Sequence, residues 1–462
     1  MENPVVQVPR IVIAGVTSGV GKTTVALATM HAFRNKGLRV QPFKVGPDFI
    51  DPSYHSLITG RQSRNLDVWM MGRRGVGECF VNACIGADVA VIEGVMGLFD
   101  GMSGRNNFAS TAHVARILKA PVILVVDAAK AARSVAAIVL GFLRFDRSIR
   151  IAGIILNNVA GDRHARYILE ALETKANIPV VGIIRRNSAA KLQERHLGLV
   201  PALELNDKKR KAIVDAARLV YEQIDSDKLL KICGTEPLPD AAASSQKRSS
   251  GRIRLAVALD DSFNFYYSDN LDALRNCGAR LEYFSPVHDG QLPHDIQGII
   301  IGGGFPEVLA DKLETNSKML KAIRNAVEDG MPVYAECGGL MYLTRSISGY
   351  KGEPKAWKMA GLVDADTIMT GKLTLNYTEA SCNSPLLGTT NVRGHEFHYS
   401  QITNISNDSR FAYTLRKGQG VDNAKDGFVV GENGLAAYMH LHFAGNKLAE
   451  KLVQACARYS NT

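Results

Sequence analysis

Short apolar runs alternate with helix-like stretches through the first 225 residues of the chain. This alternation is typical of repeated βα units, whose strands form a mostly parallel sheet. The apolar runs predict six strands, at residues 10–14, 40–44, 88–93, 121–127, 151–156 and 180–184. The N-terminal part of the chain is therefore expected to be an α/β domain.

The alternation stops between residues 226 and 251, where proline, alanine, serine and glycine dominate, as in interdomain linkers. A second α/β pattern follows. Its predicted elements are strands at residues 254–260, 297–301 and 332–335 and a helix at 270–277. We therefore expect two fused domains, at residues 1–225 and 252–462, joined by a linker at 226–251.

Composition narrows the class of protein. With 46% hydrophobic and 22% charged residues, the 462-residue chain is expected to be globular. It has no apolar run near the roughly 18 residues of a membrane span. The N-terminus does not resemble a secretory signal. The seven cysteines are scattered and form no CxxC pair, which argues against a disulfide framework or a zinc ribbon. We therefore expect a cytoplasmic protein that binds no membrane. A net charge of +10 suits an anionic partner, although the Lys208–Lys211 run is more typical of a solvated helix face.

A glycine-rich segment at residues 15–24 follows the first predicted strand and opens a helix. Backbone N–H groups of such a loop bind phosphate oxygens, a lysine reaches the β- and γ-phosphates, and a hydroxyl ligates Mg²⁺. Gly15 lies one position earlier than the strict motif requires, because Val16 occupies that position, so the loop is a variant. The predicted ATP contacts are Gly15, Thr17, Gly19, Gly21, Lys22, Thr23 and Thr24.

Two acidic residues follow predicted strands at the edge of the sheet where ligands bind in doubly wound folds. Asp48 comes after the strand at 40–44, and Glu93 ends the strand at 88–93. We expect both, together with Thr23, to ligate Mg²⁺. The alternative is that each carboxylate caps a helix.

Cys337 lies between a predicted strand and a predicted helix, with Ala335 and Gly339 on either side. Small residues fit the strained elbow on which nucleophiles are held, and a thiol at a helix N-terminus is partly ionised near neutral pH. The glycines at 302–304 could supply amides for an oxyanion, together with the Gly338 amide. His440 or His442 could be the base.

One chemistry uses both sites. A Cys–His glutaminase releases ammonia, and an ATP site activates a carboxylate as an acyl phosphate that ammonia then attacks. The alternative class is a partition-type ATPase that binds DNA. That class leaves Cys337 unexplained, and the loop lacks its additional lysine, since Ser18 and Gly19 occupy those positions. We therefore expect no nucleic-acid partner.

The chain resembles the cobyrinate a,c-diamide synthase family over almost its whole length. The matching segments are GVTSGVGKTT, KVGPDFIDPSYH, RNLD, IEGVMGLFDG, ERHLGLVPALE, GGGFPE, YAECGGLMYL, RGHEFHYS and YMHLHF. The N-terminal domain is also similar to dethiobiotin synthetase, and the C-terminal domain resembles class I glutamine amidotransferases. The resemblance implies a P-loop-type mostly parallel sheet domain that acts as the synthetase, followed by a class I amidotransferase α/β domain.

The resemblance also implies the reaction and its residues. The a- and c-acetates of cobyrinate, an anionic tetrapyrrole, would be amidated with two ATP and two L-glutamine molecules, and a homodimer is compatible with this. Cys337 would be the nucleophile and His440 would activate it. His442 stands where many class I enzymes have a carboxylate, which implies a dyad.

Less direct expectations concern other positions of the same motifs. Asp100 would act near the substrate carboxylate or stabilise a turn, and Asn157 would contact adenine. His395 and His398, with the later histidines, have spacings that a zinc ion could use, whereas the family implies a place at the substrate cavity or domain interface. Within the enzyme class, hydrogenobyrinate and nickel sirohydrochlorin are the alternative substrates.

Overall fold

The chain divides into two compact units, Met1–Ser244 and Ser245–Thr462. The computed structural model describes residues 7–186, 205–238, 251–444 and 446–460. The ERHLGLVPALE segment and residues 239–250 of the predicted linker lie outside the described residues. In the described part of the chain, no helix is long and apolar enough to cross a membrane.

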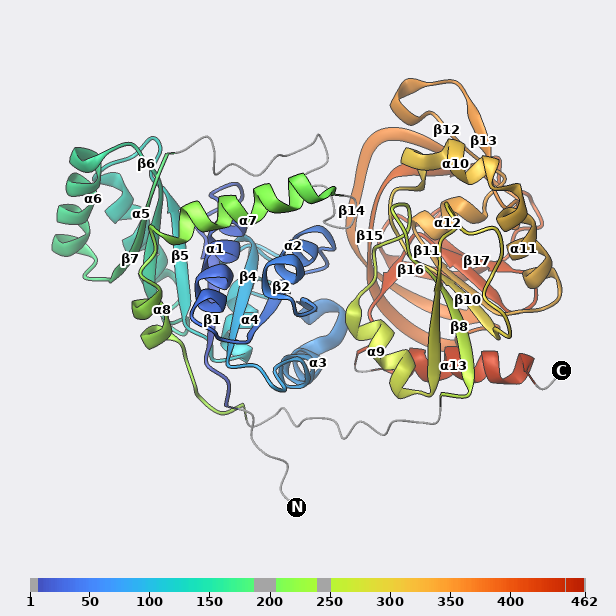
Figure 1. The fold of residues 1–462 in the computed structure, drawn as a ribbon, viewed down its shortest axis with the longest axis horizontal. Coiled ribbons are helices and arrows are strands. Elements are labelled where there is room, and N and C mark those ends of the chain that lie inside the picture. Colours follow the sequence, from blue (N-terminus) through green and yellow to red (C-terminus); the bar gives the residue numbers. More distant parts are fainter. Residues whose placement is uncertain (1–6, 187–204, 239–250, 445, 461–462) are drawn as a thin grey trace, which may run out of the picture. The chain divides into compact units, whose positions relative to one another are not determined.

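The first unit is built on a seven-stranded parallel sheet with the order β3-β2-β4-β1-β5-β6-β7 (Figure 1). The strands are β1 (Arg10–Gly15), β2 (Val40–Val45), β3 (Arg64–Leu66), β4 (Val89–Gly97), β5 (Val122–Asp127), β6 (Ile151–Val159) and β7 (Val180–Arg185). All six predicted strands are confirmed. The three-residue strand β3 was not predicted, because it is too short to show a pattern.

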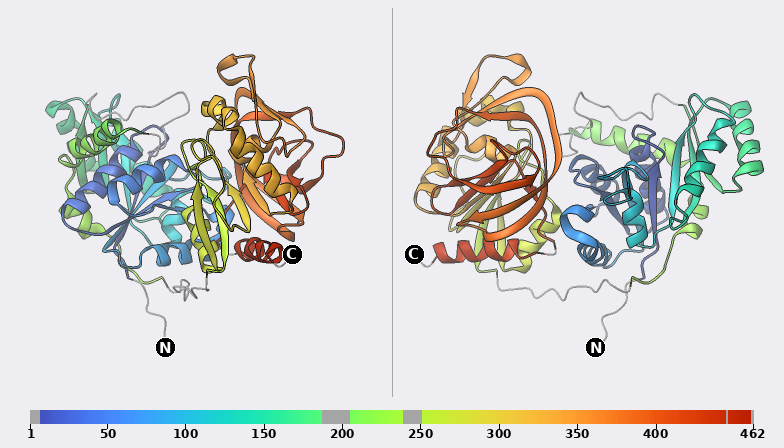
Figure 2. Two further views of the ribbon diagram at one scale, coloured as in Figure 1. Left: turned by 45° about the vertical axis from the view of Figure 1, so that its right-hand side comes forward. Right: turned by 180° about the vertical axis from the view of Figure 1, so that it is seen from behind.

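Helices cover both faces of this sheet (Figures 1 and 2). They are α1 (Lys22–Asn35), α2 (Ile50–Thr59), α3 (Val68–Ala83), α4 (Thr111–Ile117), α5 (Ser134–Phe145), α6 (Asp162–Lys175), α7 (Asp207–Tyr221) and α8 (Ser226–Ile232). Ile11 and Ile13 pack on one face with side chains of α1 and α7. On the other face, Phe43 stacks on Phe80 of α3 at 5.1 Å between ring centroids. The strands are thus buried on both sides, as their unbroken apolar runs predict.

Regular structure continues into the range predicted as a linker. Helix α8 begins at Ser226 and buries Leu229 in the core of the first unit. Arg10 and Gly234 exchange two backbone hydrogen bonds of 3.0 Å. The composition changes only after these residues, so the first unit extends at least to Gly234.

The second unit contains a mixed twelve-stranded sheet, with the order β13-β12-β14-β16-β17-β18-β11-β10-β8-β9, while β15 pairs with β14 and β19. The strands are β8 (Ile253–Ala258), β9 (Ala279–Phe284), β10 (Gly298–Ile301), β11 (Val333–Glu336), β12 (Ser346–Ser348), β13 (Ala356–Lys358), β14 (Asp366–Ser384), β15 (Gly388–Thr403), β16 (Phe411–Lys417), β17 (Lys425–Val430), β18 (Gly434–Ala437) and β19 (His440–Leu441). The predicted strands β8, β10 and β11 are confirmed. Strands β9–β8–β10–β11–β18 run parallel.

Two apolar clusters sandwich these parallel strands. The helices are η3 (Pro306–Leu309), η4 (Tyr350–Gly352), α9 (Ser268–Asn276), α10 (Ala310–Thr315), α11 (Ser317–Glu328), α12 (Gly338–Leu343) and α13 (Leu448–Tyr459). Helices α10, α11 and α12 pack with Ile299, Ile301 and Ala335 on one face. Helices α9 and α13 pack with Ile300 and Tyr334 on the other face. The alternation of neighbouring residues between the clusters follows the period of two of a β-strand.

Candidate active sites

The loop between β1 and α1 forms a compact turn around Lys22. Gly19 and Gly21 adopt positive φ angles of 74° and 91°, which glycine reaches without steric cost. A Cβ at Gly15 would lie 2.6 Å from the Val20 side chain. The Lys22 ammonium folds back and donates to the Thr17 carbonyl at 3.0 Å. The loop therefore has the backbone geometry of a phosphate-binding turn, with its lysine inside it.

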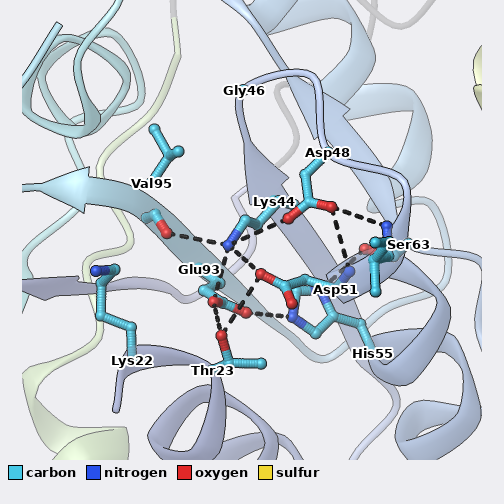
Figure 3. A network of polar contacts seen from close by, with 12 residues as sticks. Lys22, Thr23, Lys44, Gly46, Asp48, Asp51, His55, Ser63, Glu93 and Val95 are labelled. Carbon is cyan, nitrogen blue, oxygen red and sulfur yellow. Dashed lines mark hydrogen bonds and ion pairs between the residues drawn. The ribbon is translucent and has the colours of Figure 1, made fainter. Parts of the chain in front are cut away.

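A buried lysine lies near the carboxyl end of β2, opposite Glu93 in the middle of β4 (Figure 3). Lys44 Nζ lies 2.5 Å from Asp51 Oδ2, 2.8 Å from Glu93 Oε1 and 3.8 Å from Asp48 Oδ2. Thr23 Oγ1 donates to the same Glu93 oxygen at 2.7 Å. The phosphate loop and three carboxylates thus share one polar site, which holds a positive charge at its centre.

Charges in this site shift one another's pKa. Burial by itself raises the pKa of Glu93, but Lys44 and His55 outweigh burial and hold it below its usual range. Burial and the charge of Asp48 raise the pKa of Asp51. Burial and the charge of Lys44 lower the pKa of Lys22. Glu93 is thus held ionised, with His55 Nε2 at 2.6 Å from its second oxygen.

Asp48 has two roles in the structure. Its Oδ1 accepts hydrogen bonds from the backbone N–H of Ile50, at 2.8 Å, and of Asp51, at 3.4 Å, as a helix cap does. Its Oδ2 faces Lys44. Asp51, which was not predicted, lies closer than Asp48 to the lysine and also approaches the Thr23 hydroxyl, at 3.5 Å. Asp48 therefore caps a helix with one carboxylate oxygen, as the alternative predicts, while its other oxygen faces the site.

The donor set of this site fits Mg²⁺. Among the described residues, no group of three or more His, Cys, Asp and Glu side chains is arranged as a metal cage. Mg²⁺ does not need one, because it is usually held by one or two carboxylates together with waters and phosphates. The Thr23 hydroxyl and the carboxylates of Asp51 and Glu93 are hard oxygen donors beside the phosphate loop. The two carboxylates already contact the ammonium of Lys44, so the site accommodates positive charge.

Two further predicted residues lie beside the phosphate loop. Asp100 is exposed, and its Oδ2 accepts a hydrogen bond from the Gly97 N–H at 2.8 Å. This oxygen therefore stabilises a turn, as the alternative predicts. Its charge also acts on Lys22, which indicates that the two side chains are near each other. Asn157 Nδ2 donates to the Val20 carbonyl at 2.9 Å. In this structure the Asn157 amide braces the loop.

In the second unit, Cys337 occupies a sharp elbow between β11 and α12. Its φ and ψ angles of 48° and −101° are outside the usual regions for a residue with a Cβ. The Cys337 N–H donates to the Ala437 carbonyl at 2.7 Å, which fixes the elbow against β18. A Cβ at Gly339 would lie 2.2 Å from the Ile301 carbonyl oxygen. Strain at a nucleophile and small residues after it are the features of a nucleophile elbow.

The glycine segment at 302–304 lies against this elbow. A Cβ placed on Gly338 would be 3.0 Å from the Gly304 nitrogen, so the two backbone amides are close together. Gly304 has a φ of 151°, and a Cβ there would lie 2.0 Å from the Ser262 carbonyl oxygen. Backbone amides gathered beside a nucleophile can stabilise a developing oxyanion. The segment is thus placed where the sequence predicts an oxyanion hole.

His440 is the histidine that contacts the nucleophile. Burial alone would lower its pKa, but the hydrogen bond and charge of Cys337, together with Glu336, raise the pKa to about 10. His440 Nδ1 lies 3.4 Å from Glu336 Oε2. The turn before His440 is held by Asp426, whose carboxylate accepts from the N–H groups of Tyr438 and Met439 at 3.0 and 2.9 Å. A buried Cys–His pair with an adjacent carboxylate therefore occupies this end of the sheet.

The other three histidines of the predicted cluster point to different partners. His442 Nε2 lies 3.9 Å from Asp269 Oδ2, and its ring lies 4.9 Å from that of Tyr267. His395 stacks on His440 at 4.8 Å, and its Nε2 meets the Tyr267 hydroxyl at 2.7 Å. His398 stacks on Tyr438 at 3.7 Å. The histidines thus lie in one region but do not converge on a common point.

Four residues of these sites were not predicted. Lys44, Asp51 and His55 belong to the KVGPDFIDPSYH segment, in which Lys44 is the next-to-last residue of β2 and the other two are one helical turn apart. That spacing is a usable signal for a shared face. Glu336 directly precedes the nucleophile, where neighbouring strand residues ordinarily face opposite ways, so the sequence carries no signal for its contact with His440.

Comparisons with known proteins match each of the two sites to a different domain family. Residues 11–200 match the CobQ/CobB/MinD/ParA nucleotide binding domain. Residues 254–448 match the CobB/CobQ-like glutamine amidotransferase domain. The predicted α/β fold class, with a P-loop-type parallel sheet followed by an amidotransferase domain, is confirmed.

Curated relatives match along nearly the whole chain. The cobyrinate a,c-diamide synthase of Methanosarcina acetivorans is 41% identical, over 98% of this chain and 96% of its own length. The protein of the same name from Picrophilus torridus is 41% identical over 97% and 99%. That from Dehalococcoides mccartyi is 43% identical over 95% and 96%. This chain therefore belongs to the cobyrinate a,c-diamide synthase family of glutamine-dependent amidotransferases, and it joins a nucleotide-binding domain to a glutamine amidotransferase domain.

Proposed function

We propose that this enzyme amidates the a- and c-acetate carboxylates of cobyrinate, using ATP and ammonia released from glutamine, through acyl phosphate intermediates. The proposal rests on the names of the relatives and on one observation above all. A Cys–His pair on a strained elbow stands in the same chain as a phosphate loop with buried carboxylates. An ammonia source and an ATP site together suit amide synthesis from an inert carboxylate.

In the glutaminase half, Cys337 would attack the side-chain amide carbon of glutamine. The amides of Gly304 and Gly338 would stabilise the oxyanion. His440, held as imidazolium by its neighbours, would donate the proton with which ammonia leaves. Water would then attack the thioester and release glutamate, with His440 taking up the proton from water.

In the synthetase half, the substrate carboxylate and the γ-phosphate of ATP must meet although both are anionic. Lys22 and Lys44 would supply positive charge at this point, where β1 and β2 end beside Glu93 of β4. Positioning and charge neutralisation account for most catalysis of phosphoryl transfer. Mg²⁺, held by Thr23, Glu93 and Asp51 or Asp48, would supply Lewis-acid stabilisation of the phosphates.

The remaining predicted residues have narrower roles in this proposal. Asp100, near Lys22 and exposed, would take a proton from the attacking nitrogen after ammonia meets the acyl phosphate. Asn157 would contact adenine with the part of its amide that does not brace the loop. Gly15, Thr17, Gly19, Gly21 and Thr24 would complete the nucleotide site. The division into a synthetase domain, a linker and a glutaminase domain follows the predicted boundaries, with the synthetase domain extended to Gly234.

Hydrogenobyrinate and nickel sirohydrochlorin are the alternative substrates, because amidation of their carboxylates needs the same two sites. The purified full chain, given ATP, Mg²⁺ and glutamine, should convert cobyrinate to the diamide faster than either alternative. Mass spectrometry of the three reactions distinguishes them. Preferential amidation of another tetrapyrrole would reject cobyrinate as the substrate but would still support ATP- and glutamine-dependent amidation.

Two variants test the chemistry itself. Cys337→Ala should lose glutamine-dependent synthesis and keep synthesis from added ammonia, because only one of the two sites contains the thiol. Lys22→Ala should lose both, because phosphate positioning precedes either nitrogen source. Glutamine hydrolysis that survives in Cys337→Ala would reject the glutaminase site, and ammonia-driven synthesis at the wild-type rate in Lys22→Ala would reject the phosphate loop.

A further inference from the structure

We propose that Glu336 is the third member of the glutaminase site, a positioning residue that holds His440 in its reactive tautomer in place of a carboxylate two residues after that histidine. This inference rests on the proposed glutaminase function. His442 occupies the expected carboxylate position and faces Asp269 and Tyr267. The carboxylate near the imidazole comes from the residue directly before the nucleophile.

The contact involves the correct atoms. Glu336 Oε2 lies 3.4 Å from His440 Nδ1. If Nδ1 carries the proton that faces the carboxylate, Nε2 is left to accept the thiol proton of Cys337, with which His440 hydrogen-bonds. Catalytic hydrogen bonds are often long before the substrate binds and tighten afterwards. The order carboxylate, imidazole, nucleophile is that of a triad.

The carboxylate is itself held in place. Its Oε1 accepts from the Tyr334 hydroxyl at 2.5 Å and from the Leu441 N–H at 2.9 Å. Leu441 follows His440 in β19, so Glu336 binds the backbone of the strand that carries the imidazole and also faces the imidazole ring. Two hydrogen bonds on one oxygen leave the other oxygen directed at Nδ1. A carboxylate oriented in this way can fix both the tautomer and the rotamer of His440.

Burial makes the interaction effective. His440 is 1% exposed and Glu336 is 7% exposed, so solvent screens their charges little. The other titratable groups that face the imidazole are Cys337 at the elbow and His395 and His398 on β15. Burial lowers the pKa of both of these histidines, to about 4 for His398, so they are neutral near pH 7. Glu336 and Cys337 are therefore the groups that favour the imidazolium.

The elbow explains how adjacent residues can serve one site. Neighbouring residues of a regular strand point to opposite faces. Cys337 leaves the strand with a φ of 48°, which turns its side chain away from that alternation. Glu336 and Cys337 can therefore both approach His440. A carboxylate next to the nucleophile is thus geometrically compatible with the role that usually falls to a distant residue.

The test compares glutamine hydrolysis by the full chain across pH in Glu336→Gln and Tyr334→Phe. The amide in Glu336→Gln would keep the shape of the side chain and the acceptor for Leu441 but lose the charge. Tyr334→Phe removes the hydroxyl contact on Oε1 and leaves Oε2 facing the ring. We expect kcat to fall about 10- to 100-fold in Glu336→Gln, with KM changed less than about threefold, and to fall less in Tyr334→Phe, which keeps the charge and the Leu441 hydrogen bond.

The pH profile separates positioning from packing. His440 must be protonated to expel ammonia, so activity falls as pH rises through its pKa. Loss of the Glu336 charge lowers that pKa, and the alkaline limb should move about 1–3 pH units lower. An alkaline limb that stays in place in Glu336→Gln, or that moves as far in Tyr334→Phe, where the Glu336 charge is retained, would overturn the proposal.

A second variant covers the case in which Glu336→Gln does not fold. Glu336→Asp keeps the charge but withdraws it from Nδ1, so kcat should fall about tenfold while the alkaline limb moves less than in Glu336→Gln. Wild-type kcat in Glu336→Asp would show that reach to the imidazole is not needed and would also overturn the proposal. The outcome for Cys337→Ala tests the glutaminase assignment separately.

Discussion

Replacing Lys44 by methionine should lower the free energy of unfolding of the first unit while leaving its fold unchanged. Lys44 is 4% exposed and lies among the carboxylates of Asp48, Asp51 and Glu93. Methionine fills a similar volume without the charge. The variant therefore leaves buried carboxylates without their counter-ion, and removing one partner of a buried pair costs about 3–5 kcal/mol.

The magnitude can be derived from the protonation that relieves this loss. A carboxylate left without Lys44 can become neutral, which at pH 7 costs about 4.2 kcal/mol for an aspartate with an ordinary pKa of about 3.9. At pH 5 the same protonation costs about 1.5 kcal/mol. The pKa of Asp51 is already raised by burial and by Asp48, so it should take up the first proton. The loss in the free energy of unfolding should thus shrink as pH falls from 7 to 5.

Fluorescence can report this unit alone. The chain has two tryptophans, Trp69 in α3 of the first unit and Trp357 in β13 of the second. In a Trp357→Phe background, urea unfolding followed by Trp69 measures the stability of the first unit. Lys36→Met is the matched control, because Lys36 forms an exposed pair with Asp227 at 2.9 Å that contributes at most about 1 kcal/mol.

The comparison has a clear refuting result. If Lys44→Met shifts the unfolding free energy no more than Lys36→Met at pH 7, the buried network does not stabilise the unit as argued. A loss that grows toward pH 5 would also contradict the reasoning, since protonation should relieve the unpaired carboxylates. Ammonia-driven synthesis should be lost in Lys44→Met and retained in Lys36→Met.

Two other predictions concern residues at the active sites. His440→Ala should lower glutamine hydrolysis roughly a hundredfold or more, as expected for removal of a general base, whereas His442→Ala, which faces Asp269, should lower it less than about tenfold. Steady-state rates measure both, and equal losses or the reverse order would mean that the wrong histidine has been assigned. Asp100→Asn should keep ATP binding and slow amide formation, so that a singly amidated product accumulates in mass spectra. Normal diamide output, or a lowered melting temperature alone, would leave Asp100 only its turn contact with Gly97.

Much of the architecture could be predicted from the sequence, because its signals are local. Buried parallel strands appear as unbroken apolar runs, and six of them in the first unit were predicted. The phosphate loop and the elbow at Cys337 could be recognised because each depends on residues adjacent along the chain. The short strand β3 and the long β14–β15 hairpin were missed. The first is too short to show a period, and the second mixes polar and apolar residues, with many exposed side chains.

The tertiary structure decided what surrounds each reactive group. Lys44, Asp51 and Glu93 come from β2, α2 and β4, and only the sheet order brings them to one point. The choice of His440 over His442 depends on which imidazole reaches Cys337, and alternation along a strand does not distinguish two residues two positions apart. Glu336 contacts His440 because the elbow breaks the alternation of the strand. The reactive residues could thus be predicted from local sequence motifs. Their partners depend on long-range packing, which no local pattern encodes.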